Sequence, residues 1–119
     1  MEEFRIEKDT LGAVNVPAGA YYGAQTQRAA ENFRVNGIKF QPEFIRAQVI
    51  IKRSAAIANA ELGKLDKKLA GAIVQAADEI LDGNLADQFI LDYLQAGAGT
   101  SQNMNVNRSY RLFSRIRIW

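Results

Sequence analysis

A short segment near residue 100 holds the side chains with the clearest chemical potential. It reads Gln95-Ala96-Gly97-Ala98-Gly99-Thr100-Ser101-Gln102-Asn103-Met104-Asn105-Val106-Asn107. Gly97 and Gly99 permit backbone conformations that a β-carbon would hinder. Thr100 or Ser101 could cap a helix that begins there, and exposed N–H groups at a helix start attract anions. The segment therefore indicates a site for a small carboxylate.

The three asparagines that follow cannot all serve one ligand. On a helix, Asn103 and Asn107 lie four residues apart on one face, while Asn105 points largely away from it. One of them would bind the ligand, and the others would support the structure around it. The alternative is a glycine-rich turn with an Asn or Thr cap and no ligand, because short glycine motifs are weak signals. A phosphate-binding loop is excluded, since no lysine follows the glycines.

Two helices are expected to support this segment. Residues 43–62 carry an apolar stripe at helical spacing, followed by Gly63 as a stop. Its members are Phe44, Ala47, Ile51, Ala55, Ala58 and Leu62. The next helix opens at Asp66, a good N-cap, and ends before Gly83. Its stripe consists of Leu69, Ile73, Ala76, Ala77 and Ile80. We expect an antiparallel pair in which both stripes are buried by packing.

The start of the chain favours strands. Phe4 and Ile6, then Val14 and Val16, alternate with polar residues on either side of a turn, which predicts a short hairpin. Residues 21–33 then read as a short helix. From 85 to 94 the helical period is lost. The fold class is therefore mainly α, with a short N-terminal β-hairpin followed by helices.

The charged pairs on the helices offer less chemistry. Lys52-Arg53 and Lys67-Lys68 are most simply solvated helix faces. The acidic residues Asp78, Glu79 and Asp82 look like a paired-carboxylate site, but they are expected to lie on the surface.

Composition narrows the remaining possibilities. The chain has 119 residues, 48% hydrophobic and 24% charged, which suits one globular domain. It has no cysteine and no histidine, so disulfides, Cys/His zinc sites and thiol nucleophiles are excluded, and no metal or cofactor is expected. No apolar run approaches a membrane span, and the charged start is no signal peptide, so we expect a cytoplasmic protein without membrane contact.

Charge is distributed unevenly along the chain. The first 107 residues contain 11 Lys and Arg against 13 Asp and Glu, and the last twelve add four arginines. These are Arg108, Arg111, Arg115 and Arg117. A small nucleic-acid-binding module using this tail is one alternative, but no basic face extends into the body, so no nucleic-acid partner is expected.

An ordered run of motifs resembles the class II fumarase/aspartase family over residues 4–107. The matching stretches are Arg5-Ile6-Glu7-Lys8-Asp9, Val16-Pro17, Tyr22-Gly23-Ala24-Gln25-Thr26-Gln27-Arg28-Ala29, Glu31-Asn32-Phe33, Lys52-Arg53, Ala76-Ala77-Asp78-Glu79-Ile80, Asp87-Gln88-Phe89, Gly97-Ala98-Gly99-Thr100-Ser101 and Asn103-Met104-Asn105-Val106-Asn107.

This resemblance implies the N-terminal domain of a homotetrameric, mostly helical lyase with a central helix bundle. Such enzymes remove water or ammonia from a small dicarboxylate to give fumarate, and a base takes the proton next to a carboxylate that carries the developing charge. Thr100 matches the family's carboxylate-binding hydroxyl. Gly99 and Ser101 would form the turn, and Asn103 would be a neighbouring donor.

The choice of leaving group stays open. The stretch from Gly97 to Ser101, with Ala98 where typical fumarases place Ser, resembles aspartases. The stretch from Gly23 to Arg28 resembles fumarases. Aspartate ammonia-lyase is slightly favoured over fumarate hydratase.

The resemblance ends after Asn107. The family continues Glu-Val-Ile-Ala, whereas this chain reads Arg-Ser-Tyr-Arg, which is what a step back of one base after the Asn107 codon would produce. We therefore expect residues 1–107 to be a truncated lyase N-terminal domain, without the central bundle, and residues 108–119 to be an atypical, Arg-rich, frameshift-derived tail. The catalytic residues would lie outside this chain, which alone should be inactive. A non-catalytic truncated product is the corresponding alternative.

Overall fold

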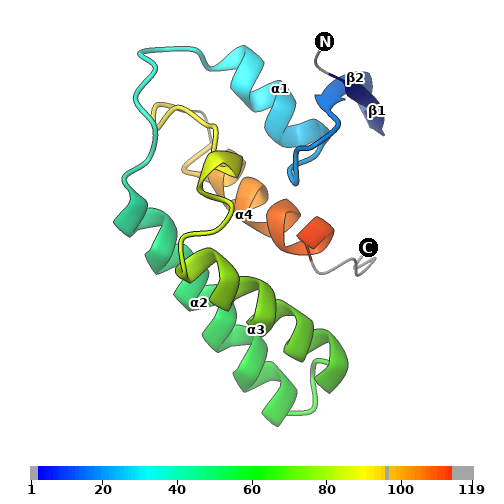
Figure 1. Ribbon diagram of the computed structural model, residues 1–119, viewed down its shortest axis with the longest axis vertical. Helices are drawn as coiled ribbons and strands as arrows, with labels where there is room; N and C mark the ends of the chain where they lie inside the picture. The colour runs from blue at the N-terminus through cyan, green and yellow to red at the C-terminus, as the bar shows by residue number, and fades with distance from the viewer. Residues whose placement is uncertain (1–2, 96, 114–119) are drawn as a thin grey trace.

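The computed structural model describes residues 3–95 and 97–113. In chain order the elements are β1 (Phe4–Asp9), β2 (Gly12–Pro17), α1 (Ala24–Asn32), α2 (Pro42–Glu61), α3 (Lys67–Leu81), the 3-10 turn η1 (Ala86–Gln88) and α4 (Thr100–Phe113). The mainly helical fold with one short antiparallel hairpin confirms the predicted class. Figure 1 shows the hairpin and α1 at one end of the molecule and the α2–α3 pair at the other.

The hairpin is tied to the loop that follows it by one side chain. β1 and β2 pair in register from Phe4 opposite Pro17 to Asp9 opposite Gly12. The guanidinium of Arg5 donates to four backbone carbonyls at 2.8 to 3.1 Å. These belong to Pro17, Ala18, Ala20 and Tyr22. Charged donors make the stronger hydrogen bonds, so Arg5 fixes the path from the hairpin to α1.

Helix α4 lies between the two ends of the molecule (Figure 1), and contacts α1 on one side and α2 and α3 on the other. Its buried face follows the helical period and is largely polar. Gln102, Asn105, Val106 and Ser109 are each at most 1% exposed. Val106 joins the main apolar cluster with Val49, Ala76, Ala77, Ile80 and Phe89. The site segment is therefore held from both sides.

The predicted antiparallel pair of helices is present, but the predicted packing face of α2 is wrong. Ile51 and Leu62 are 68% and 69% exposed and Phe44 is 47% exposed, whereas Val49 is fully buried. Ala47, Ala55 and Ala58 of the same stripe are also exposed. Helical periodicity identifies an apolar stripe but not its partner. In this chain α3 and α4 pack against the opposite face, which includes Val49 and Ala56.

The start of α3 agrees with the sequence. The Asp66 side chain accepts hydrogen bonds from the backbone amides of Lys68 and Leu69, as an N-cap should. No helix in the described part of the chain combines the length and the apolar character needed to cross a membrane.

Helix α4 continues beyond Asn107. It runs to Phe113, and Ser109 is fully buried with its hydroxyl donating to the carbonyl of Asn105. Secondary structure therefore gives no boundary at Asn107, although the sequence pattern changes there. Residues 114–119 of the predicted tail lie outside the described residues.

Candidate functional site

The candidate site begins with an unusual backbone turn before α4. Gly97, Ala98 and Gly99 have φ values of +78°, +50° and +87°. Glycine adopts this left-handed region without steric penalty, whereas Ala98 does so at a cost of roughly 1 to 2 kcal/mol. Three such residues in succession form a sharp turn directly before α4. The sequence predicted this turn from its two glycines.

Thr100 does not cap the helix in the way the sequence suggested. It lies inside the first turn, and its hydroxyl donates to the carbonyl of Gly97 at 2.6 Å. The cap comes instead from Gln95, whose Oε1 accepts the backbone amide of Gln102 at 2.8 Å. Gln95 is in turn held by its Nε2, which donates to the carbonyl of Asp92. A side chain seven residues before its partner lies outside the usual N-cap pattern.

The backbone amides in the first turn of α4 differ in whether they have a hydrogen-bond acceptor. Those of Thr100 and Asn103 donate to the carbonyls of Gly97 and Gly99, and that of Gln102 donates to Gln95. Among the described residues, the amide of Ser101 has no acceptor. An unoccupied amide at a helix N-terminus is a donor with a favourable dipole for an anion.

A lysine from another helix completes this region. Lys52 of α2 donates from Nζ to Oδ1 of Asn103 at 2.6 Å. Partial burial lowers the pKa of the Lys52 ammonium. The sequence pattern predicted a solvated helix face for this lysine, whereas its side chain is half-buried and contacts α4. Its position three residues after Val49 and four before Ala56, both buried, places it beside the packed face of the helix.

The second member of that basic pair also has a partner. Arg53 donates from Nε to Oδ1 of Asp78 on α3 at 2.7 Å, and the carboxylate raises the pKa of the guanidinium. The pair Lys52-Arg53 therefore has two separate tasks. Arg53 links α2 to α3, whereas Lys52 reaches α4.

The asparagines separate as predicted. Asn103 and Asn107 are exposed, while Asn105 is fully buried and donates from Nδ2 to the carbonyl of Gln88 at 2.9 Å. The predicted site residues Gly99, Thr100 and Ser101 are contiguous at the helix start, and Asn103 follows within one turn. These residues lie at the N-terminal end of α4, where Lys52 of α2 contacts Asn103.

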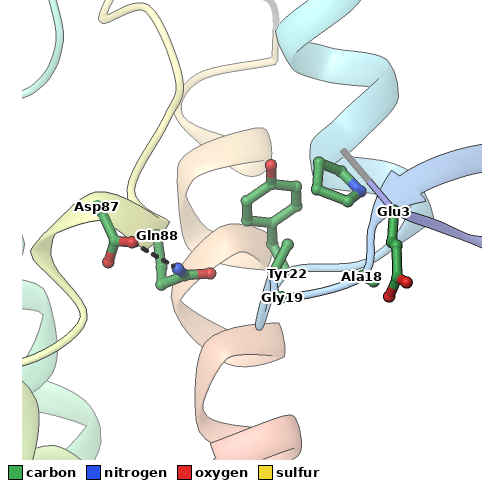
Figure 2. A pocket seen from close by; sticks show the side chains of 8 residues that line it. Glu3, Ala18, Gly19, Tyr22, Asp87 and Gln88 are labelled. Atoms are coloured by element: carbon green, nitrogen blue, oxygen red, sulfur yellow. Dashed lines mark hydrogen bonds between the residues drawn. The ribbon is translucent and has the colours of Figure 1, made fainter. Parts of the chain in front are cut away.

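Two pockets elsewhere are not formed by these residues. The larger, of about 570 Å³, lies between the loop after β2 and η1, and is lined by Glu3, Pro17, Ala18, Gly19, Ala20, Tyr22, Asp87 and Gln88. Figure 2 shows the Glu3 and Asp87 carboxylates on its walls. Two carboxylates would repel a dicarboxylate. The other pocket, of about 450 Å³, includes Phe33, Lys39 and Asp92.

No group of three or more acidic side chains in residues 3–95 and 97–113 is arranged to hold a metal ion. The start of α4 itself offers backbone and side-chain hydrogen-bond donors and, from Lys52, a positive charge. Neutral donors and an ammonium at one end of a helix suit the binding of a carboxylate.

The fold and the sequence are similar to those of known lyases. Residues 12–112 match the family model described as Lyase. The chain is 54% identical over 105 residues to aspartate ammonia-lyase of a Bacillus species, covering 88% of this chain and 22% of that protein. It is also 54% identical over 106 residues to class II fumarate hydratase of Halobacterium salinarum, covering 89% of this chain and 23% of that protein.

Solved structures agree with this result. The class II fumarase from Schistosoma mansoni superposes with a TM-score of 0.90 at 38% identity, covering 94% of this chain and 24% of that chain. A fumarate lyase:delta crystallin structure from Brucella melitensis gives a TM-score of 0.88 at 42% identity, with coverage of 94% and 26%. The chain thus spans about a quarter of the length of the proteins it matches. It belongs to the lyase family that includes aspartate ammonia-lyase and class II fumarate hydratase.

Proposed function

We propose that this chain supplies the carboxylate-binding turn of a fumarate-forming lyase. The observation that carries the proposal is the meeting of three features at one helix start. These are the left-handed turn at Gly97 to Gly99, the amide of Ser101, which has no acceptor among residues 3–95 and 97–113, and the ammonium of Lys52 beside Asn103. Each favours a negatively charged oxygen.

Thr100 is the proposed contact to the substrate. Its hydroxyl now donates to the carbonyl of Gly97. Binding would exchange this neutral acceptor for a carboxylate oxygen, and a charged acceptor gives the stronger bond. Ser101 would add its amide, and Asn103 its side-chain NH₂ group.

The reaction that fits such a site is removal of a proton from the carbon next to a bound carboxylate. The developing charge then spreads onto the carboxylate, where fixed donors lower the barrier. Aspartate is the slightly favoured substrate, with ammonia as leaving group. Malate, with water as leaving group, is the alternative, because relatives of both names match at the same identity. We place the whole enzyme in the cytoplasm as a homotetramer without a cofactor.

Two chimeras test this proposal. Residues 3–107 would replace the matching segment of the Bacillus subtilis aspartate ammonia-lyase or of the Halobacterium class II fumarate hydratase. Fumarate formation, followed by ultraviolet absorbance, should be retained in at least one of them, and the host in which it is retained indicates the leaving group.

In the active chimera, Thr100→Val should lower kcat/KM by roughly 10²-fold or more, whereas Thr100→Ser should retain most of it, because it keeps the hydroxyl. Equal activity of the Thr100→Val variant and the parent chimera would contradict the assignment of the substrate contact.

A further inference from the structure

Lys52 of α2 and Asn103 of α4 are 51 positions apart in the sequence, and a hydrogen bond joins them where the two helices are in contact. The contact of 2.6 Å between Nζ and Oδ1 is short for a nitrogen donor and an oxygen acceptor. Lys52 is half-buried and Asn103 is exposed. The ammonium therefore approaches from the protein side, and the asparagine forms the outer layer.

This contact decides which way the Asn103 amide is turned. An asparagine presents one oxygen that accepts and one NH₂ group that donates, and a lysine ammonium can only donate. The oxygen must then face Lys52, and the NH₂ group must face away from it. The amide is thereby held with its donors available to an acceptor outside the protein.

Lys52 also lacks the usual counter-ion. In the described part of the chain its neighbour Arg53 is paired with Asp78, whereas no carboxylate lies within ion-pair distance of Lys52. A partly buried cation with only a neutral acceptor has lost hydration without full compensation. An anion bound nearby would compensate the ammonium for its lost hydration. The lowered pKa of Lys52 is consistent with that loss, because burial disfavours the charged form.

We propose that Lys52 is a positioning residue, which holds the Asn103 amide with its NH₂ group toward a substrate carboxylate and adds positive charge behind it. The inference rests on the proposed function, since it names how the same site selects an anionic group. It goes beyond that proposal in assigning to Lys52 the orientation of the Asn103 amide, so that a residue of α2 determines which atoms of α4 face the substrate.

The test is an NMR titration of the full 119-residue chain with sodium succinate, a dicarboxylate that carries neither leaving group. Sodium chloride at equal ionic strength is the reference. In the wild type, succinate should shift the side-chain NH₂ resonances of Asn103 and the Cε resonance of Lys52, and chloride should not. Absence of any succinate-specific shift would overturn the carboxylate site and this inference together.

Variants distinguish a failure of the carboxylate site from a failure of the role of Lys52. Lys52→Met keeps the apolar stem and removes the ammonium, and it should weaken succinate binding by roughly tenfold or more. Lys52→Arg should recover part of the affinity. The matched control is Arg53→Gln, which removes the adjacent cation and should leave affinity unchanged. If wild type and Lys52→Met bind equally well, the role of Lys52 is wrong and the carboxylate site stands.

A second variant keeps the inference falsifiable should Lys52→Met fold poorly. Asn103→Leu changes an exposed residue, and it should weaken binding to a similar degree with Lys52 in place. In the double variant the two losses should not add, because Lys52 acts through Asn103. Additive losses, or an Arg53→Gln variant as weak as Lys52→Met, would overturn the positioning role.

Discussion

The carboxylate of Glu7 lies against the backbone of Gly23, and its Oε2 accepts the amide of Ala24, the first residue of α1, at 3.1 Å. A β-carbon on Gly23 would lie 2.8 Å from the same oxygen. Glu7 also accepts a hydrogen bond from Arg5 at 2.9 Å. A strand residue therefore occupies the place of a helix cap, and its carboxylate lies where a β-carbon at position 23 would push it aside.

The first prediction follows from that contact. Gly23→Ala should push the Glu7 carboxylate away from Ala24 and Arg5, and lower the free energy of unfolding by about 1 to 3 kcal/mol. Gly19→Ala is the matched control, because a β-carbon there would meet nothing within 4 Å. Urea unfolding followed by circular dichroism measures both. Equal stability of the two variants would show that the close approach at Gly23 carries no energy.

The second prediction concerns the two faces of α2. Val49→Ala removes buried methyl groups from the main cluster, and it should cost about 2 kcal/mol of unfolding free energy. Ile51→Ala, at a side chain that is 68% exposed, should change it by less than about 0.5 kcal/mol. The same urea experiment compares them. A larger loss at Ile51 than at Val49 would mean that the helix packs by the opposite face.

The third prediction is a dependence of stability on pH. Asp92 is buried, and its two oxygens accept the backbone amides of Asn36, Gly37 and Leu94 at 2.8 to 2.9 Å. These hydrogen bonds, that from Asn36 foremost, lower the pKa of Asp92 below 3.8. A carboxyl whose pKa is depressed by folding stabilises the fold above its unfolded pKa, and this stabilisation is lost as pH falls through the folded value.

Asp92→Asn should therefore lower the thermal midpoint by several degrees at pH 7, and the gap to the wild type should narrow below about pH 4. Asp82→Asn, at an exposed position after α3, is the control and should show little change at either pH. Thermal unfolding across the pH range gives the result. A gap that is constant with pH would exclude a contribution from the ionised carboxylate.

The fourth prediction concerns turnover by the chain alone. The purified 119-residue chain should form no fumarate from aspartate or malate, because it has no histidine and the acid and base of the reaction are expected outside it. The active chimera serves as the positive control in the same absorbance assay. Measurable turnover by the chain, lost on replacing Thr100 with Val, would require a base among these residues.

Much of the architecture followed from local sequence. The alternation around Val14 and Val16 predicted the hairpin, and Asp66 predicted the start of α3, because strand alternation and capping depend on neighbouring residues. The glycines at 97 and 99 predicted the turn for the same reason, since positive φ is a property of one residue and its side chain. The family could also be identified from the ordered motifs.

What the sequence could not decide was which elements meet. The apolar stripe of Ile51 and Leu62 is regular, yet α3 and α4 pack on the opposite face of α2, and no local rule distinguishes the two faces. Lys52 and Asn103 are brought together only by that packing. The contact between Gln95 and the amide of Gln102 likewise depends on how the chain turns between them, because the two residues are seven positions apart. The sequence by itself determined the turn, the elements and the family. Only the tertiary packing brought the Lys52 ammonium to Asn103, because the two residues lie on different helices and no local rule relates them.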